Sequence, residues 1–216
     1  MDFAILGPLE VRDGGAPVPV RGVRQRVVLA VLLLHPNEFV ARDRLIDAVW
    51  RQRAPADAAH ALDVQMSRLR ATLGGDRVTT HSGGYSLRVE DGELDLQRFE
   101  ALRARAAGAG AEAASALLSE ALALWRGAPL ADLADDGIPH AELAHLEEAR
   151  LVALDERIDA DLEIGRHRAL VPELDALVAL HPYREHYREA QMVALYRSVR
   201  RAASYAASAS AWRPLR

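Results

Sequence analysis

The sequence contains no cysteine and no lysine, and only 5% of its residues are aromatic. The absence of cysteine excludes disulfide bonds, thiolate metal sites and cysteine nucleophiles. The sequence also has no apolar run long enough to span a membrane, and it does not open with the basic and apolar segments of a secretory signal peptide. We therefore expect a cytoplasmic protein that makes no contact with a membrane.

The residue patterns that catalysis requires are missing as well. The eight histidines form no His-Glu-x-x-His arrangement, and the pairs His140/His145 and His181/His186 are spaced so that their members point to different faces of a helix. There is no nucleophile elbow, and the glycine pairs are better explained by a helix end and a turn than by a phosphate-binding loop. We expect no catalytic residue, no metal ion and no cofactor, which disfavours a hydrolase or transferase.

Length and charge indicate two parts. The 216 residues, half of them hydrophobic, suffice for one large or two modest domains, each with its own core. All 27 basic residues are arginines: residues 1–90 carry 12 of them against 10 acidic residues, whereas the remainder carries 15 against 21. This asymmetry supports a boundary near Asp91-Gly92, and thus domains 1–91 and 92–216.

The hydrophobic pattern of residues 1–91 follows the order of a winged helix-turn-helix. Short β-prone runs at 3–6 and 9–12 predict a small antiparallel sheet. Residues 23–34 are apolar nearly all round and predict a buried helix, and a second helix places Leu45, Ile46, Val49 and Trp50 on one stripe. A third helix is predicted from Asp57 to Leu73, followed by a wing hairpin that turns at residues 82–84.

The third helix presents two different faces. At about 100° per residue, Leu62, Met66, Leu69 and Leu73 share a stripe that must face the core. The opposite face combines small residues, a branched apolar residue, an amide and an arginine, the mixture that suits base edges in a major groove. An ordinary solvated helix face is the alternative, and this face alone leaves both interpretations open. The outward residues are Asp57, His60, Ala61, Val64, Arg68 and Ala71, with Gln65 and Ser67 on the flanks.

Two further features favour DNA as the ligand. The wing residues Thr79, Thr80, His81 and Ser82 could reach phosphates or the minor groove. Scattered arginines could neutralise phosphate charge; these are Arg24, Arg26, Arg42, Arg44, Arg51 and Arg53.

From residue 94 onward, alanine- and leucine-rich amphipathic segments replace the strands. Five helices are predicted, separated by glycine and proline breaks, and short connections between antiparallel helices suggest a tetratricopeptide-like (TPR-like) all-α domain. The segments are 96–107, 111–124, 141–164, 169–180 and 183–197.

Three motifs, "RDRLIDAVW", "LDVQMSRLRATLG" and "VTTHSGGYSL", resemble the winged-helix DNA-binding domain of OmpR/PhoB-type response regulators. Downstream, "LHPYREHYREAQMVALYRS" resembles the bacterial transcriptional activation domain. Together they resemble the Streptomyces antibiotic regulatory protein (SARP) family over about nine-tenths of the chain. The resemblance implies a transcriptional activator that binds direct repeats of double-stranded promoter DNA in biosynthetic gene clusters and recruits RNA polymerase.

The resemblance also assigns roles to residues. It implies base or phosphate contacts for Gln65 and Arg68 and a backbone contact for Arg70, while His81 stands where the family wing often has an arginine. Side-by-side protomers on direct repeats would form a homodimer on DNA. The complete candidate DNA-binding set is Arg24, Arg42, Arg44, His60, Ala61, Val64, Gln65, Ser67, Arg68, Arg70, Thr80, His81 and Ser82, and the candidate polymerase contacts are Arg51, Gln52, Arg53 and Ala54.

One segment departs from the family. The end, "VRRAASYAASASAWRPLR", lacks the final helices that the resemblance implies, and a truncated or frame-shifted terminus is our hypothesis. An alternative function also stays open: a protein-interaction scaffold in which the helical part acts and the front part binds no DNA productively.

Overall fold

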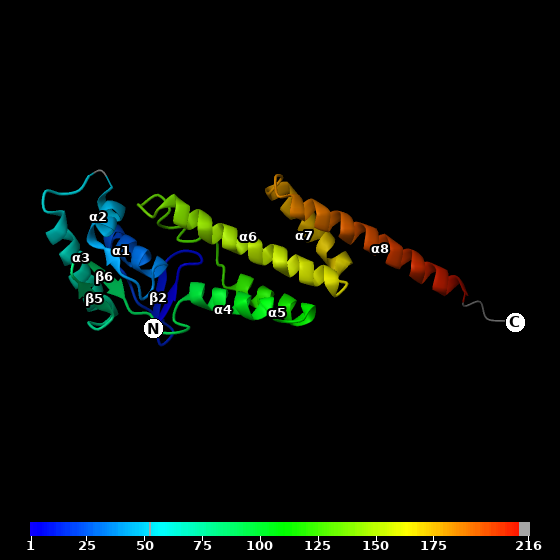
Figure 1. Ribbon diagram of the computed structural model, residues 1–216, viewed down its shortest axis with the longest axis horizontal. Helices are drawn as coiled ribbons and strands as arrows, with labels where there is room; N and C mark the ends of the chain where they lie inside the picture. Colours follow the sequence, from blue (N-terminus) through cyan, green and yellow to red (C-terminus); the bar gives the residue numbers. More distant parts are fainter. Residues whose placement is uncertain (52, 212–216) are drawn as a thin grey trace. The chain divides into compact units, whose positions relative to one another are not determined.

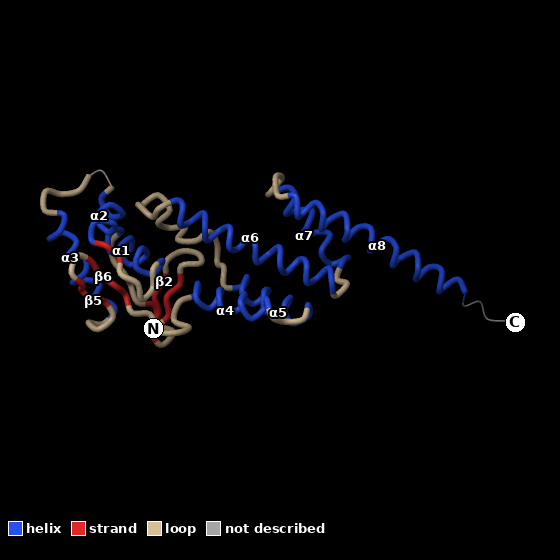
Figure 2. The backbone as a smooth tube through the Cα atoms, viewed as in Figure 1, coloured by secondary structure: helices blue, strands red, loops and turns tan. Residues whose placement is uncertain are grey.

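The computed structural model describes residues 1–51 and 53–211, with side chains as far as residue 199. Within that range it contains eight helices and six short strands. Figures 1 and 2 show the course of the chain through these elements. The mainly helical fold, with small sheets in the first part only, confirms the prediction. In chain order the elements are β1 (Asp2–Ala4), β2 (Glu10–Asp13), β3 (Ala16–Pro17), α1 (Val23–Leu34), β4 (Val40–Ala41), α2 (Arg42–Trp50), α3 (Ala58–Leu73), β5 (Val78–His81), β6 (Gly84–Leu87), α4 (Asp95–Ala107), α5 (Ala111–Ala123), α6 (His140–Glu163), α7 (His167–Leu180) and α8 (Glu185–Ala211).

The chain folds into two compact units that do not follow chain order. The first unit comprises residues 1–102 and 121–150, and the second comprises 103–120 and 151–216. The predicted domain boundary at residue 91 lies in the loop between β6 and α4 and stays a prediction.

Two small antiparallel sheets belong to the first unit. One has the strand order β1-β2-β3, with Phe3 opposite Val11; the other has the order β4-β6-β5. In the second sheet, Tyr85 of the central strand β6 lies between Val40 of β4 and Thr80 of β5. The sequence pattern did not reveal β4, because two residues are too few to show the alternation typical of a strand.

The core of the first unit surrounds α1. This helix is buried continuously from Val27 to Leu33, as its all-round apolar sequence predicts. Helices α2 and α3 both pack on it. Trp50 at the end of α2 and Tyr85 in the wing are 7% and 2% exposed, so both side chains belong to this core.

A segment from the helical part of the sequence completes this unit. The amide of Arg126 donates to the carbonyl of Leu6 (2.7 Å), and the amide of Leu130 donates to that of Ile5 (3.1 Å). At Gly137, which has a φ of +108°, a side chain would overlap the carbonyl oxygen of Ala48 in α2. Since both the conformation and the close approach require glycine, this loop is fitted closely against α2.

The second unit is built from helices. Its core contains Leu170, Leu174 and Leu177 of α7 together with Tyr187 of α8, and α7 and α8 form its largest helix contact. Helix α8 continues to Ala211, beyond the predicted end at residue 197, because the alanine-rich run that follows has a high helix propensity. The final residues 212–216, part of the segment interpreted as a truncated or frame-shifted terminus, lie outside the described residues.

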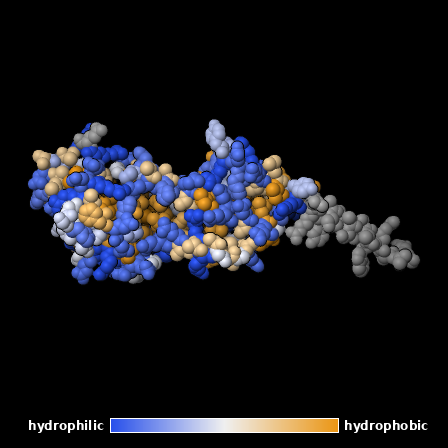
Figure 3. All heavy atoms as spheres, in the orientation of Figure 1, coloured by the Kyte–Doolittle hydropathy of each residue, from blue (hydrophilic) through white to orange (hydrophobic). Residues whose placement is uncertain are grey.

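In the described residues, none of the helices combines the length and hydrophobicity needed to cross a membrane. The face drawn in Figure 3 is predominantly hydrophilic, with small hydrophobic areas between the polar ones.

Candidate nucleic-acid interface

Local signals define the two ends of helix α3. The carboxylate of Asp57 accepts a hydrogen bond from the amide of His60 (3.0 Å), which satisfies one of the free N–H groups at the start of the helix. The helix ends at Gly74, whose φ of +95° is favourable only for glycine. The helix observed, Ala58–Leu73, therefore agrees with the predicted range.

The inward face of α3 is the predicted apolar stripe. Leu62, Met66 and Leu69 are fully buried, and Leu73 is 3% exposed. Burying such side chains contributes about 1.5–3 kcal/mol each, so the stripe fixes the rotation of the helix about its axis. The prediction that these four residues face the core is confirmed.

The outward face carries the candidate base-reading residues. His60, Ser67 and Arg68 are exposed, while Ala61, Val64 and Gln65 are half-buried at its margins. No ion pair or side-chain hydrogen bond holds the Arg68 guanidinium within the part of the chain that the structure describes. Its five N–H donors are therefore available to an external acceptor.

Arg70 has a different environment, although it lies only two residues further along α3. Its Nε donates to the carbonyl of Val78 (3.1 Å), and its Nη2 donates to the hydroxyl of Thr80 (2.6 Å). Arg70 thus connects α3 to strand β5 of the wing and positions the wing. The predicted backbone contact of Arg70 with DNA stays a prediction.

The tip of the wing is exposed and polar. Thr80, His81 and Ser82 are all exposed, and the Nε2 of His81 lies 2.8 Å from the hydroxyl of Ser86. The amide of Arg42, at the start of α2, donates to the carbonyl of Gly83 (2.9 Å). The wing is therefore attached to both helices of the helix-turn-helix.

A polar network joins α2, α3 and the wing. Nη2 of Arg42 lies 3.2 Å from the carboxylate of Asp63 and 3.1 Å from the hydroxyl of Tyr85, and that hydroxyl donates to Asp63. Burial, followed by the bond to Asp63, raises the pKa of Tyr85. Sequence reasoning assigned no role to Asp63, because its partners lie more than 20 residues away in the chain.

Other arginines in the candidate set also have partners. Arg44 forms an ion pair with Glu142 of α6, and the guanidinium of Arg24 lies 5.8 Å from the centre of the Trp50 ring. Arg26, which was expected to neutralise phosphate charge, is paired with Asp132. Because these partners neutralise or cover the guanidinium groups, Arg68 is the more available cation.

The candidate polymerase loop follows α2. Nη1 of Arg51 donates to the carbonyl of Asp135 (3.2 Å), which fixes the start of the loop. Arg53 and Ala54 are exposed, and Gln52 lies outside the described residues.

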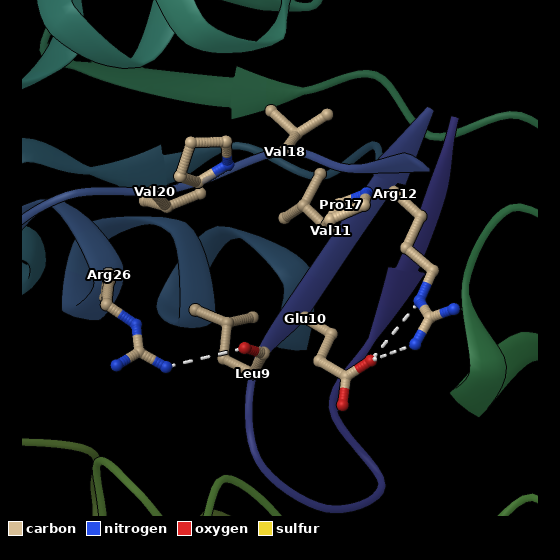
Figure 4. Close-up of a pocket in the computed structure, with 9 residues that line it drawn as sticks. Leu9, Glu10, Val11, Arg12, Pro17, Val18, Val20 and Arg26 are labelled. Atoms are coloured by element: carbon tan, nitrogen blue, oxygen red, sulfur yellow. Dashed lines mark hydrogen bonds and ion pairs between the residues drawn. The ribbon is translucent and has the colours of Figure 1, made fainter. Parts of the chain in front are cut away.

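Two of the pockets in the described part of the chain lie in the first unit. The one in Figure 4, about 330 Å³, is lined by the second and third strands and the start of α1. Each charged group that lines it is paired: Glu10 with Arg12, and Arg26 with Asp132. The other, about 520 Å³, lies between α2 and residues 137–140, and its Arg44 is likewise paired with Glu142. Among the described residues, the pocket in Figure 4 therefore presents no uncompensated charge to a ligand.

Clusters of three or more histidine, aspartate or glutamate side chains able to hold a metal ion are not found among the described residues.

A winged helix followed by a helical domain is an architecture found in transcriptional regulators. Comparison with known families agrees, since the family described as "Transcriptional regulatory protein, C terminal" matches residues 21–87. The family "Bacterial transcriptional activator domain" matches residues 94–216.

Comparison with individual proteins identifies the family within the transcriptional regulators. The regulatory protein AfsR of Streptomyces griseus is 40% identical over 99% of this chain, and DnrI of Streptomyces peucetius is 36% identical over 93% of it. The solved structure of Mycobacterium tuberculosis EmbR in complex with a low-affinity phosphopeptide superimposes with a TM-score of 0.88 at 36% identity, over 93% of this chain. The chain belongs to the SARP family of transcriptional activators.

The relatives differ in length from this chain. It spans 22% of AfsR, 79% of DnrI and 56% of the EmbR chain.

Proposed function

We propose that this protein is a sequence-specific DNA-binding activator of transcription, which binds direct repeats in the promoters of a secondary-metabolite gene cluster and recruits RNA polymerase. The main support for the proposal is the orientation of α3. Its apolar stripe is buried in the winged-helix core, and the unpaired guanidinium of Arg68 lies on the face turned to solvent.

The chemistry of this face suits a major groove. A guanidinium can donate two hydrogen bonds to O6 and N7 of guanine, an amide can bind adenine, and an aliphatic group can contact the methyl group of thymine. Arg68, Gln65 and Val64 supply these three groups from one side of a helix. The wing, connected to α3 through Arg70, would reach the adjacent phosphates or minor groove.

Charge supports binding in pairs. Residues 1–90 have a small excess of arginine over acidic residues, and several of the arginines are already paired within the chain. A single protomer would bind DNA weakly. Two protomers bound to repeats about one helical turn apart would together reach a higher affinity.

Substitution of Arg68 tests the proposal. Footprinting on the promoters that flank the protein's own gene would first locate the binding site. We expect Arg68→Ala to weaken binding to that site by about 1–3 kcal/mol and to relax the preference for the base that Arg68 contacts. The matched control is Arg105→Ala, which removes the same charge from an exposed position on α4 and should leave binding unchanged.

The results separate the two functions that the sequence left open. An interaction scaffold would show no salt-dependent binding of the unaltered protein to any duplex. If the unaltered protein binds but Arg68→Ala retains full affinity and base preference, the assignment of Arg68 is wrong.

For the polymerase loop, Arg53→Ala should reduce transcription in vitro from a bound promoter without reducing its occupancy.

A further inference from the structure

Phe39 is a large apolar side chain that the fold leaves in solvent beside the wing. It precedes β4 and is 55% exposed, whereas Val40, the next residue, is 2% exposed. Phe39 belongs neither to the candidate DNA-binding set nor to the candidate polymerase contacts. An exposed phenyl ring next to the wing tip needs a physical explanation.

The wing sheet holds the Phe39 ring in place. Gly84 of the central strand β6 lies opposite Ala41 of β4 on one side and opposite His81 of β5 on the other. A Cβ atom at Gly84 would lie 2.5 Å from Cε2 of Phe39. The edge of the phenyl ring therefore occupies the space above the central strand that any side chain at position 84 would fill.

The ring reaches across the sheet to His81. The two ring centroids are 6.0 Å apart and the rings meet edge to face at 77°, and the imidazole is also hydrogen-bonded to the hydroxyl of Ser86. Phe39 and His81 thus form a surface of two rings in contact, beside the exposed Ser82.

We propose that Phe39 is a further DNA-contact residue, which packs its ring against the deoxyriboses that line the minor groove where the wing approaches the duplex. This inference rests on the proposed function. The C–H groups of deoxyribose are the apolar part of the DNA backbone. A phenyl ring can pack against them because it has no hydrogen-bonding group that would need a partner. The fixed position of the ring lowers the entropy lost on binding.

Such a contact has a distinctive signature. A phenyl ring releases no counterions from phosphate and reads no base edge. We therefore expect Phe39→Ala to weaken binding by about 3- to 10-fold, with the base preference and the slope of log K against log salt concentration unchanged. Arg68→Ala, measured in parallel on the same site, should relax the base preference instead.

Hydroxyl-radical footprinting tests the location of the contact, because these radicals attack deoxyribose. Phe39→Leu keeps an apolar group over Gly84 but removes the flat ring, and it should lose protection at the few sugars facing the wing while keeping protection elsewhere. This second variant serves if Phe39→Ala fails to fold, as thermal unfolding would reveal. Tyr183→Ala, which removes an aromatic ring that is 96% exposed in the second unit, is the matched control and should change nothing.

The outcomes distinguish this inference from the proposed function. If Arg68→Ala weakens binding but folded Phe39 variants keep full affinity and an unaltered sugar footprint, only the contact by Phe39 is refuted. If Phe39→Ala lowers the salt slope or alters base preference, Phe39 acts through the charged groups and the sugar contact is refuted. If the unaltered protein binds no duplex, the proposed function itself fails.

Discussion

The arginines of the second unit and Arg68 of α3 show how the same side chain serves two purposes. In the second unit, Asp161 accepts hydrogen bonds from Arg157 (2.8 Å), Arg166 (2.9 Å) and Ser115 (2.7 Å). This carboxylate is 5% exposed and connects α5, α6 and the start of α7. Arg68, in contrast, is exposed, and none of the carboxylates that the structure describes pairs with it.

The difference shows that the partner, rather than the residue type, separates structural arginines from those available to a ligand. Lysine is absent, so arginine supplies every basic side chain of both kinds. A planar guanidinium can bind a carboxylate through two parallel hydrogen bonds, and it can bind guanine or phosphate in the same way. Breaking each kind of contact should therefore have different consequences.

The largest effect is expected where a buried carboxylate holds two arginines. Asp161→Ala would leave the guanidinium of Arg157 and the hydroxyl of Ser115 without their shared acceptor, and we expect the free energy of unfolding to fall by about 3 kcal/mol. Urea denaturation followed by circular dichroism measures this change. Glu163→Ala, two residues away and exposed, is the control; an equal loss in both variants would show that the network has no special importance.

A smaller effect is expected for the ion pair between Arg77 and Glu93 in the first unit, which is bidentate with distances of 2.6 and 2.7 Å. The hydrogen bonds from Arg77 lower the pKa of Glu93 from its ordinary value of 4.5 to about 2. Because the folded state has the lower pKa, the pair stabilises the protein fully above pH 4.5, and this contribution is lost as the pH falls toward 2.

Glu93→Gln should accordingly reduce the free energy of unfolding by about 1–2 kcal/mol at neutral pH. The difference between the variant and the unaltered protein should shrink as unfolding is measured at successively lower pH between 4.5 and 2. A difference that stays constant over this range would contradict the assigned pKa shift.

The smallest effect comes from comparing the two arginines of α3. Arg70→Ala removes two hydrogen bonds to the wing and should lower stability by about 1 kcal/mol. Arg68→Ala removes none and should change stability by less than about 0.5 kcal/mol. Thermal unfolding of the two variants without DNA makes the comparison, and equal losses of stability would contradict the positioning role of Arg70.

Much of this structure could be predicted from sequence, where the signals are local. The inward stripe of α3 follows from the spacing of Leu62, Met66 and Leu69, and the end of the helix follows from Gly74. The order of helices and hairpin then indicated a winged helix. Each of these signals lies within one turn or one element, so no knowledge of distant contacts was needed.

The remaining features depend on contacts between distant parts of the chain. Strand β4 exists because Val40 and Ala41 pair with β6, and the pairing of Arg42 with Asp63 depends on how α2 and α3 pack. For the same reason the sequence could indicate that Arg42 and Arg44 are basic, but not that carboxylates neutralise them. The exposed ring of Phe39 became apparent only once Gly84 was placed beneath it.

The loop that closes on α2 through Gly137 has a practical consequence for protein engineering. Hybrid regulators can be made by exchanging the winged-helix part between relatives of this family. A chimera joined at residue 91 would combine one parent's winged helix with another parent's loop, and any parent with a larger residue at position 137 would collide with α2. Hybrid regulators should therefore inherit residues 1–102 and 121–150 from the same parent.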